Sequence, residues 1–173
     1  MPAILNPLGR ISETETRNVT PLPSLAGATI AVLDNSKHNF RELMERVRPM
    51  IDEQYSGVTW LYERKSGGFH PMSAEIQQRI LDQADLVLTG IADCGCVSWS
   101  SHDAATFEQA GVPAVLFLTT PFKATAEATY RQMGFSDARM VEVDHPLGGL
   151  PPTMVDERAA KIADTVAEVL KNN

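Results

Sequence analysis

The segment Leu86-Val87-Leu88-Thr89-Gly90-Ile91 leads within two residues into Asp93-Cys94-Gly95-Cys96-Val97-Ser98-Trp99-Ser100-Ser101-His102-Asp103. The first part is a continuous apolar run, which is typical of a strand that is covered on both faces of a sheet. The second part is a turn rich in Gly and Ser, and it leads into Ala104-Ala105-Thr106-Phe107-Glu108, a sequence that favours a helix. A strand that passes through a short turn into a helix is the repeating unit of an open α/β sheet.

The same alternation repeats along the rest of the chain. Apolar runs predict strands over 29–33, 58–62, 86–91, 114–118 and 140–143. Helical spacing of apolar residues, Ser73 as an N-cap and the Pro151-Pro152 pair predict helices over 40–51, from 73, near 101–110, over 122–133 and after 152. Because strands and helices alternate, we expect a three-layer α/β/α sandwich with a flavodoxin-like, mostly parallel sheet of about five strands.

Length and composition predict one domain preceded by an arm. The chain has 173 residues, of which 43% are hydrophobic, enough for one good core and too few for two ordinary domains. Residues 1–27 contain four prolines and a polar stretch, so we predict an extended arm there and a single α/β domain over 28–173. The arm would lie over its own domain or on a neighbouring subunit, and the second arrangement would make the protein a homo-oligomer.

Charge and hydropathy exclude several classes of partner. The net charge is −7 and the isoelectric point is about 5.0, which argues against nucleic acid, because proteins that bind its phosphate backbone carry a basic excess. No apolar run approaches the roughly 20 residues that span a membrane, and no basic segment with an apolar core begins the chain. We therefore expect a cytoplasmic protein with no membrane partner.

Both cysteines lie in the turn after the predicted strand over 86–91. Backbone N–H groups and the positive end of the following helix favour a thiolate there, and a thiolate is a strong nucleophile at neutral pH. We predict that Cys94 is catalytic and that Cys96 is its partner, which would resolve a sulfenic acid or a mixed disulfide. The reverse assignment stays open, and a disulfide between cysteines this close in sequence would be strained.

The carboxyl ends of parallel strands meet at one edge of a sheet, and polar residues follow several of the predicted strands. Lys37 is predicted to lower the pKa of the thiol or to bind a substrate carboxylate, and His102 and His145 are candidate proton carriers. Some of these residues also suit turns and helix caps. The candidates for substrate binding are Asn35, Ser36, Lys65, Asp93, Gly95, Ser98, Trp99, Ser100, Thr119 and Thr120.

Cofactor signatures are missing from the sequence. It contains neither the GxGxxG loop of dinucleotide-binding folds nor a Walker A loop, and no paired CxxC or HxxxH spacing. We expect no cofactor and no bound metal. The cysteines and histidines are nevertheless residue types that ligate zinc or copper, so a metal- or small-molecule-binding module remains an alternative.

Several segments resemble, in order, those of a known family. They are Ile4-Leu5-Asn6-Pro7-Leu8-Gly9, Leu25-Ala26-Gly27, Leu33-Asp34-Asn35-Ser36-Lys37, Asp93-Cys94, Val97-Ser98-Trp99-Ser100-Ser101-His102-Asp103-Ala104 and His145-Pro146. Over most of its length the chain resembles the UGSC-motif proteins, named for a selenocysteine- or cysteine-Gly-Ser-Cys motif. The resemblance implies that Cys94 takes the position that is selenocysteine in some relatives, which favours redox or nucleophilic chemistry. Here the motif reads Cys94-Gly95-Cys96, without the serine, so the second sulfur is one residue closer.

These observations predict a thiol-dependent enzyme that acts on a small polar molecule. We prefer an oxidoreductase, in which Cys94 attacks the substrate and Cys96 or an external thiol reductant resolves the covalent intermediate. The alternative is a lyase or hydrolase in which the thiolate adds to a carbon centre and a histidine moves the proton. A redox cycle needs both sulfurs or an external reductant, whereas the alternative needs only one sulfur.

Overall fold

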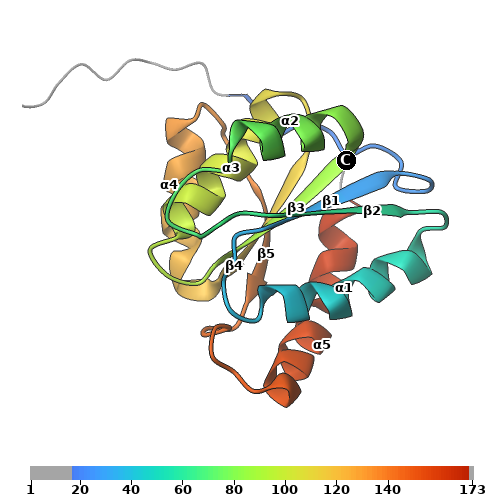
Figure 1. Cartoon of the computed structure of the whole chain (residues 1–173), viewed down its shortest axis with the longest axis vertical. Coiled ribbons are helices and arrows are strands. Elements are labelled where there is room, and N and C mark those ends of the chain that lie inside the picture. The colour runs from blue at the N-terminus through green and yellow to red at the C-terminus, as the bar shows by residue number, and fades with distance from the viewer. Residues whose placement is uncertain (1–16, 172–173) are drawn as a thin grey trace, which may run out of the picture.

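The computed structural model describes residues 17–171, and strands and helices alternate throughout this part of the chain (Figure 1). The elements are β1 Thr29–Asp34, α1 Phe40–Gln54, β2 Thr59–Arg64, α2 Ala74–Gln83, β3 Leu86–Ala92, α3 Val97–Gln109, β4 Ala114–Thr119, the short 3-10 helix η1 Thr120–Phe122, α4 Lys123–Gln132, β5 Arg139–Val143 and α5 Pro152–Val169. All five predicted strands are confirmed, with ends within a few residues of those expected.

The strands form one parallel sheet in the order β2-β1-β3-β4-β5. This is a flavodoxin-like order, so the predicted fold class is confirmed. The chain moves from β1 outward to β2 and then crosses back to β3, which lies on the other side of β1. The order therefore reverses between β1 and β3, and such a switch point opens a crevice at the carboxyl ends of the two strands.

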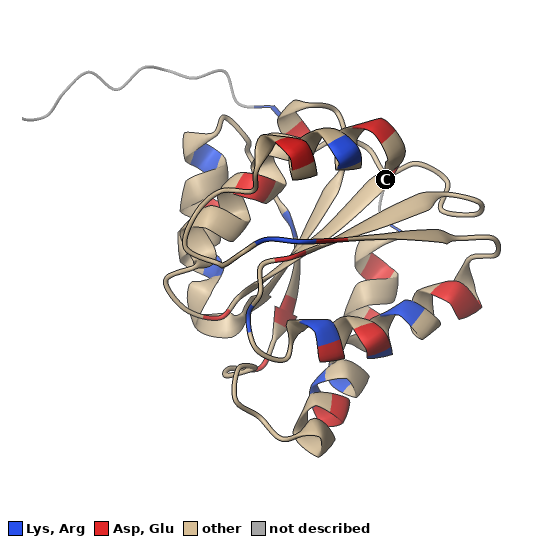
Figure 2. Cartoon of the chain, in the orientation of Figure 1, with Lys and Arg blue, Asp and Glu red and all other residues tan. Residues whose placement is uncertain are grey.

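Helices cover both faces of the sheet. Helices α1 and α5 pack on one face, and α2, α3 and α4 lie on the other (Figure 1). Helix α1 buries Phe40, Leu43 and Val47, whose helical spacing puts them on one side. Charged residues are spread over the helices, whereas the central strands β3 and β4 carry none (Figure 2). The two central strands are buried along their whole lengths, as their continuous apolar sequences predict.

Strand β3 changes its register with β4 just before the cysteines. The shift lies between Thr89 and Ala92, and a Cβ at Gly90 would lie 2.8 Å from the carbonyl oxygen of Phe117. Only glycine allows the two backbones to approach this closely without a displacement. The register shift thus precedes the turn at Asp93 and Cys94, where the chain leaves the sheet.

Helix α3 begins at Val97, earlier than the predicted start near 101. The Val97 N–H donates to the carbonyl of Cys94, and the Ser100 N–H donates to the carbonyl of Cys96, both at 3.0 Å. These bonds turn a serine-rich stretch into the first turn of a helix. Ser100 and Ser101 are buried, so this stretch is part of the packed domain and does not form an open loop.

The described part of the predicted arm, residues 17–27, packs on its own domain. The Arg17 N–H donates to the Gly134 carbonyl, and the Thr20 N–H donates to the carboxylate of Glu108. Leu22 and Leu25 are buried in the core under α1 and α5. Residues 1–16 of the predicted arm lie outside the described residues. Within 17–171, none of the helices has the length and apolar character needed to cross a membrane.

Candidate functional site

The two cysteines lie at the carboxyl end of β3, beside the switch point. Cys94 is half-buried and Cys96 is fully buried, and both are free thiols. Their sulfur atoms are 3.3 Å apart, and the Cys96 sulfur is 3.4 Å from the carbonyl oxygen of Ile91. The Cys96 N–H also points at the Cys94 sulfur, at 3.5 Å. One sulfur is therefore accessible, and the other lies directly behind it.

The surroundings move the two thiol pKa values in opposite directions. Partial burial acts to raise the pKa of Cys94, but the hydrogen bonds from the Cys96 backbone and thiol and the positive charge of Lys37 outweigh it, so this pKa is lowered. Burial raises the pKa of Cys96, and the neighbouring Cys94 raises it further. The accessible sulfur is thus the one that ionises more readily.

Lys37 follows β1 and faces the thiols across the switch point. Burial acts to lower its pKa, but its interactions with Cys94, Cys96 and Asp93 raise the pKa overall. Its ammonium nitrogen lies 5.5 Å from the centre of the Phe69 ring, a cation–π distance. The sequence analysis predicted that Lys37 lowers the pKa of the thiol, and the structure places it where its charge has that effect.

Asp93 joins the loops at the ends of β3, β4 and β5. Its Oδ1 accepts hydrogen bonds from Thr119 Oγ1 at 2.9 Å and from His145 Nδ1 at 3.1 Å. The backbone N–H of Gly148 donates to its Oδ2 at 2.8 Å, and a Cβ at Gly148 would lie 3.0 Å from that oxygen. The Leu147 N–H adds a further bond. Since its oxygens accept hydrogen bonds inside the protein, Asp93 anchors the loop, and substrate binding is not needed to explain it.

These contacts also fix the ring of His145. Ionised Asp93 can only accept hydrogen bonds, so His145 Nδ1 carries a proton toward it, and in the neutral ring Nε2 is left as an acceptor. The side chain is 41% exposed, and its ring packs edge to face against Phe122. Among residues 17–171, no hydrogen bond joins Cys94 to a histidine. The partly exposed ring of His145 is therefore oriented by Asp93 and is not hydrogen-bonded to the thiol.

Asn35 and Ser100 are committed to internal hydrogen bonds. The Asn35 side chain donates to the carbonyl of Ile91 and to Ser100 Oγ, and it accepts from the N–H groups of Ile91 and Lys37. All of these groups belong to the ends of β1 and β3 or to the start of α3. The prediction that Asn35 and Ser100 bind substrate is not supported, because their polar atoms hold the switch point together.

Ser36 has a similar internal role. Its hydroxyl donates to the backbone carbonyl of Lys65 and accepts from the Arg64 guanidinium at 3.0 Å. These bonds tie the loop after β1 to the loop after β2. Ser36 therefore connects two neighbouring loops, and substrate binding is not needed to explain it.

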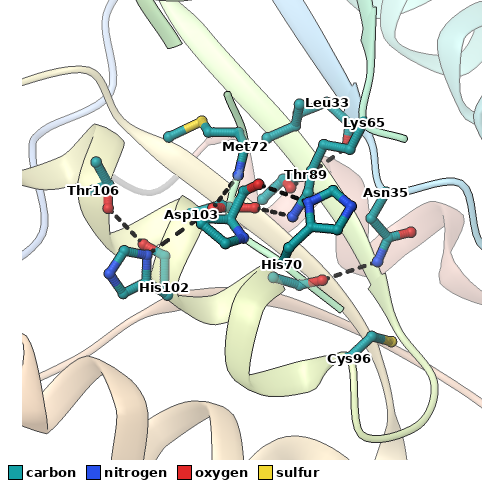
Figure 3. A network of polar contacts seen from close by, with 12 residues as sticks. Leu33, Asn35, Lys65, His70, Met72, Thr89, Cys96, His102, Asp103 and Thr106 are labelled. Atoms are coloured by element: carbon teal, nitrogen blue, oxygen red, sulfur yellow. Dashed lines mark hydrogen bonds and ion pairs between the residues drawn. The ribbon is translucent and has the colours of Figure 1, made fainter. Parts of the chain in front are cut away.

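Lys65 does not face the crevice. Its ammonium pairs at 2.5 Å with the carboxylate of Asp103 on α3, and both side chains are at most 2% exposed (Figure 3). Asp103 also accepts from the N–H of Met72 at 3.1 Å. Lys65 was predicted to bind substrate, but the structure commits its ammonium to an ion pair that joins the loop after β2 to α3 beneath the surface.

Ser98, Trp99 and His102 belong to a different part of the surface. They line a cavity of about 250 Å³ together with residues of α4, and the lining includes neither cysteine. The Trp99 and His102 rings pack edge to face at 5.5 Å. The structure therefore does not bring these predicted site residues to the thiols.

Gly95 and Thr120 are the remaining predicted substrate ligands. Gly95 is exposed in the turn between the cysteines, and a Cβ there would meet nothing within 4 Å. Thr120 is exposed, but its hydroxyl donates to the carbonyl of Val143 at 3.3 Å. Gly95 thus lies open beside Cys94, whereas Thr120 caps the loop after β5. In the described part of the chain, no group of three or more His, Cys, Asp and Glu side chains is arranged to hold a metal ion.

The loop after β2 was expected at this edge of the sheet, but its close contact with Cys96 was not predicted from the sequence. Gly68 is buried there, and a Cβ at this position would lie 3.1 Å from the Cβ of Cys96. The next residue, Phe69, is 67% exposed, the highest exposure of any large hydrophobic side chain in residues 17–171. The Gly67-Gly68 pair, which allows a close approach of backbone to another group, was the available signal for this contact.

The family model that matches the chain is that of the UGSC family, over residues 3–172. A comparison with curated proteins finds no match. Among solved structures, the chain is similar to a protein from Bacillus anthracis str. Sterne that is provisionally described as a diacylglycerol kinase. The identity is 14% and the TM-score is 0.36, over 64% of this chain and only 40% of that structure. A Burkholderia pseudomallei K96243 protein, provisionally described as pilus assembly-related, has 18% identity and a TM-score of 0.39, over 83% of this chain and 95% of that one.

Proposed function

The chain belongs to the UGSC family, and from this premise we propose that it is a thiol-dependent oxidoreductase acting on a small polar molecule. Cys94 would be the attacking thiolate and Cys96 the resolving thiol. The observation that supports this most is a half-buried sulfur that lies 3.3 Å from a fully buried one, in surroundings that lower the pKa of the first and raise that of the second. An accessible thiolate backed by a protonated thiol is the arrangement that a dithiol cycle requires.

In the proposed cycle, the Cys94 thiolate attacks one oxygen of a hydroperoxide, ROOH. The oxygen–oxygen bond breaks, Cys94 becomes a sulfenic acid, and the alkoxide RO⁻ takes up a proton to leave as ROH. The thiol of Cys96 then attacks the Cys94 sulfur, which releases water and forms a disulfide. Two molecules of an external thiol, R′SH, reduce this disulfide and leave as R′SSR′. With a disulfide substrate, RSSR, Cys94 would form a mixed disulfide and release one RS⁻, which takes up a proton, and Cys96 would then release the second thiol as the internal disulfide forms.

His145 would supply the proton that the leaving group needs. Its ring is held by Asp93 at the same edge of the sheet as Cys94. Because Lys37 already favours the thiolate, His145 is not required to deprotonate Cys94. The Asp93–His145 pair also supports a second candidate function, a lyase or hydrolase in which the thiolate adds to a carbon centre and His145 transfers the proton.

Stoichiometric oxidation distinguishes the two functions. When the reduced protein is treated with one equivalent of hydrogen peroxide, we expect intact-mass analysis to show the mass of an internal disulfide. In the C96S variant the reaction should stop at a sulfenic acid on Cys94, which dimedone traps. If Cys94 in the wild-type protein reacts with hydrogen peroxide no faster than free cysteine does, the oxidoreductase function is excluded. The lyase or hydrolase then becomes the preferred function.

A further inference from the structure

Lys37 is the cation that the structure places against the thiols. Two other basic residues nearby are already paired, since Arg64 lies 3.6 Å from Asp34 and Lys65 is buried against Asp103. In residues 17–171, no carboxylate forms an ion pair with Lys37. The nearby carboxylate of Asp93 instead accepts hydrogen bonds from Thr119 and from the Gly148 N–H. Cys94, whose pKa Lys37 helps to lower, is therefore the group whose ionised form would pair with Lys37.

This pairing changes once Cys94 reacts. When its sulfur forms a covalent bond to a substrate atom, the thiolate loses its charge and Lys37 loses this neighbouring anion, while Asp93 remains bound to its own hydrogen-bond donors. A substrate that carries its own carboxylate restores the pair as the thiolate charge is lost, in the transition state and in the covalent intermediate. A neutral substrate of the same shape does not.

The aromatic ring beside Lys37 indicates the shape of the rest of the substrate. Phe69 exposes most of its side chain, and its ring centre lies 5.5 Å from the Lys37 ammonium. The preceding Gly68 is packed against Cys96, so this ring is held near the thiols by its backbone. An apolar surface next to a cation fits a small organic acid whose carboxylate meets Lys37 and whose carbon skeleton lies on the ring.

Resting on the proposed thiol function, we propose that Lys37 binds the carboxylate of the substrate and that the substrates are small monocarboxylates with the reactive atom close to the carboxylate. Lys37 would therefore have two roles: it would stabilise the Cys94 thiolate, and it would favour substrates that carry a carboxylate. Phe69 would contact the apolar part of the same molecule.

Two alkylating reagents of nearly equal shape test this charge preference. Iodoacetate carries a carboxylate where iodoacetamide carries a neutral amide, and both attack the same thiolate. The ratio of their second-order rate constants is independent of the thiolate fraction, so a change in the pKa of Cys94 does not affect it. We expect this ratio for Cys94 to exceed that of the neutral thiol N-acetylcysteine amide by about fivefold at low salt and to fall toward it at 1 M salt, as expected for an exposed charge.

Three variants make the test specific. K37Q should abolish the preference for iodoacetate, K37R should retain it, and K123Q, which removes a lysine that pairs with Glu142 elsewhere, should leave it unchanged. If Cys94 reacts rapidly with both reagents but without preference for the anion, the carboxylate proposal is overturned and the thiol function stands. If Cys94 reacts slowly with both reagents, the thiol function itself fails.

Discussion

Replacement of Lys65 by methionine should lower the free energy of unfolding by about 3 to 5 kcal/mol, because the variant leaves the Asp103 carboxylate buried without a charged partner. Both members of this pair are at most 2% exposed, so water cannot replace the lost ammonium. Urea denaturation of the two proteins measures the difference directly. A loss below about 1 kcal/mol would show that the pair behaves like a surface ion pair.

Two comparisons separate the lost charge from other effects of that replacement. K123M removes an exposed lysine that pairs with Glu142 and should cost less than about 1 kcal/mol. The double variant K65M/D103L, which removes both charges, should recover much of the stability.

The stability of K65M should also depend on pH. Burial already raises the pKa of Asp103, and loss of Lys65 raises it further. A carboxyl group whose pKa is raised by folding stabilises the folded state at low pH and loses this contribution as the pH rises. The deficit of K65M should therefore shrink as the pH falls from 7 toward 4. A deficit that stays constant would mean that the unpaired carboxylate is not its cause.

The second large effect concerns thiol reactivity. At neutral pH the C94S variant should react with iodoacetamide more than about tenfold more slowly than the wild-type protein, because it lacks the accessible thiol whose pKa is lowered. The remaining thiol, Cys96, is fully buried and its pKa is raised. The matched variant C96S keeps Lys37 beside Cys94 and should stay within about tenfold of the wild type. Faster labelling of C94S than of C96S would reverse the assignment of the two sulfurs.

The fold follows from sequence patterns that are local. Continuous apolar runs such as 86–91 and 114–118 require burial on both faces, and the helices between them force parallel crossovers. The start of α3 was placed too late because serines favour turns, while the hydrogen bonds that close its first turn involve the carbonyls of Cys94 and Cys96. Backbone hydrogen bonds of this kind cannot be predicted from the pattern of residue types alone.

The site could be predicted only in part for a related reason. Cys94, Lys37 and His145 follow different strands, and the parallel sheet brings their loops to one edge. Lys65 also follows a strand, yet its side chain turns inward. Its partner Asp103 lies 38 positions further along the chain, on a helix face that the sequence does not reveal.

The pH dependence of Cys94 alkylation is the most direct measurement of the proposed activation. The wild-type protein is labelled with a limiting amount of iodoacetamide between about pH 5 and 9, and the two cysteines are separated by peptide mapping. Because the rate follows the thiolate fraction, activation predicts that Cys94 labels first, with a midpoint well below the ordinary cysteine pKa of about 8.5. A midpoint at or above that value, or faster labelling of Cys96, would contradict a reactive thiolate at Cys94.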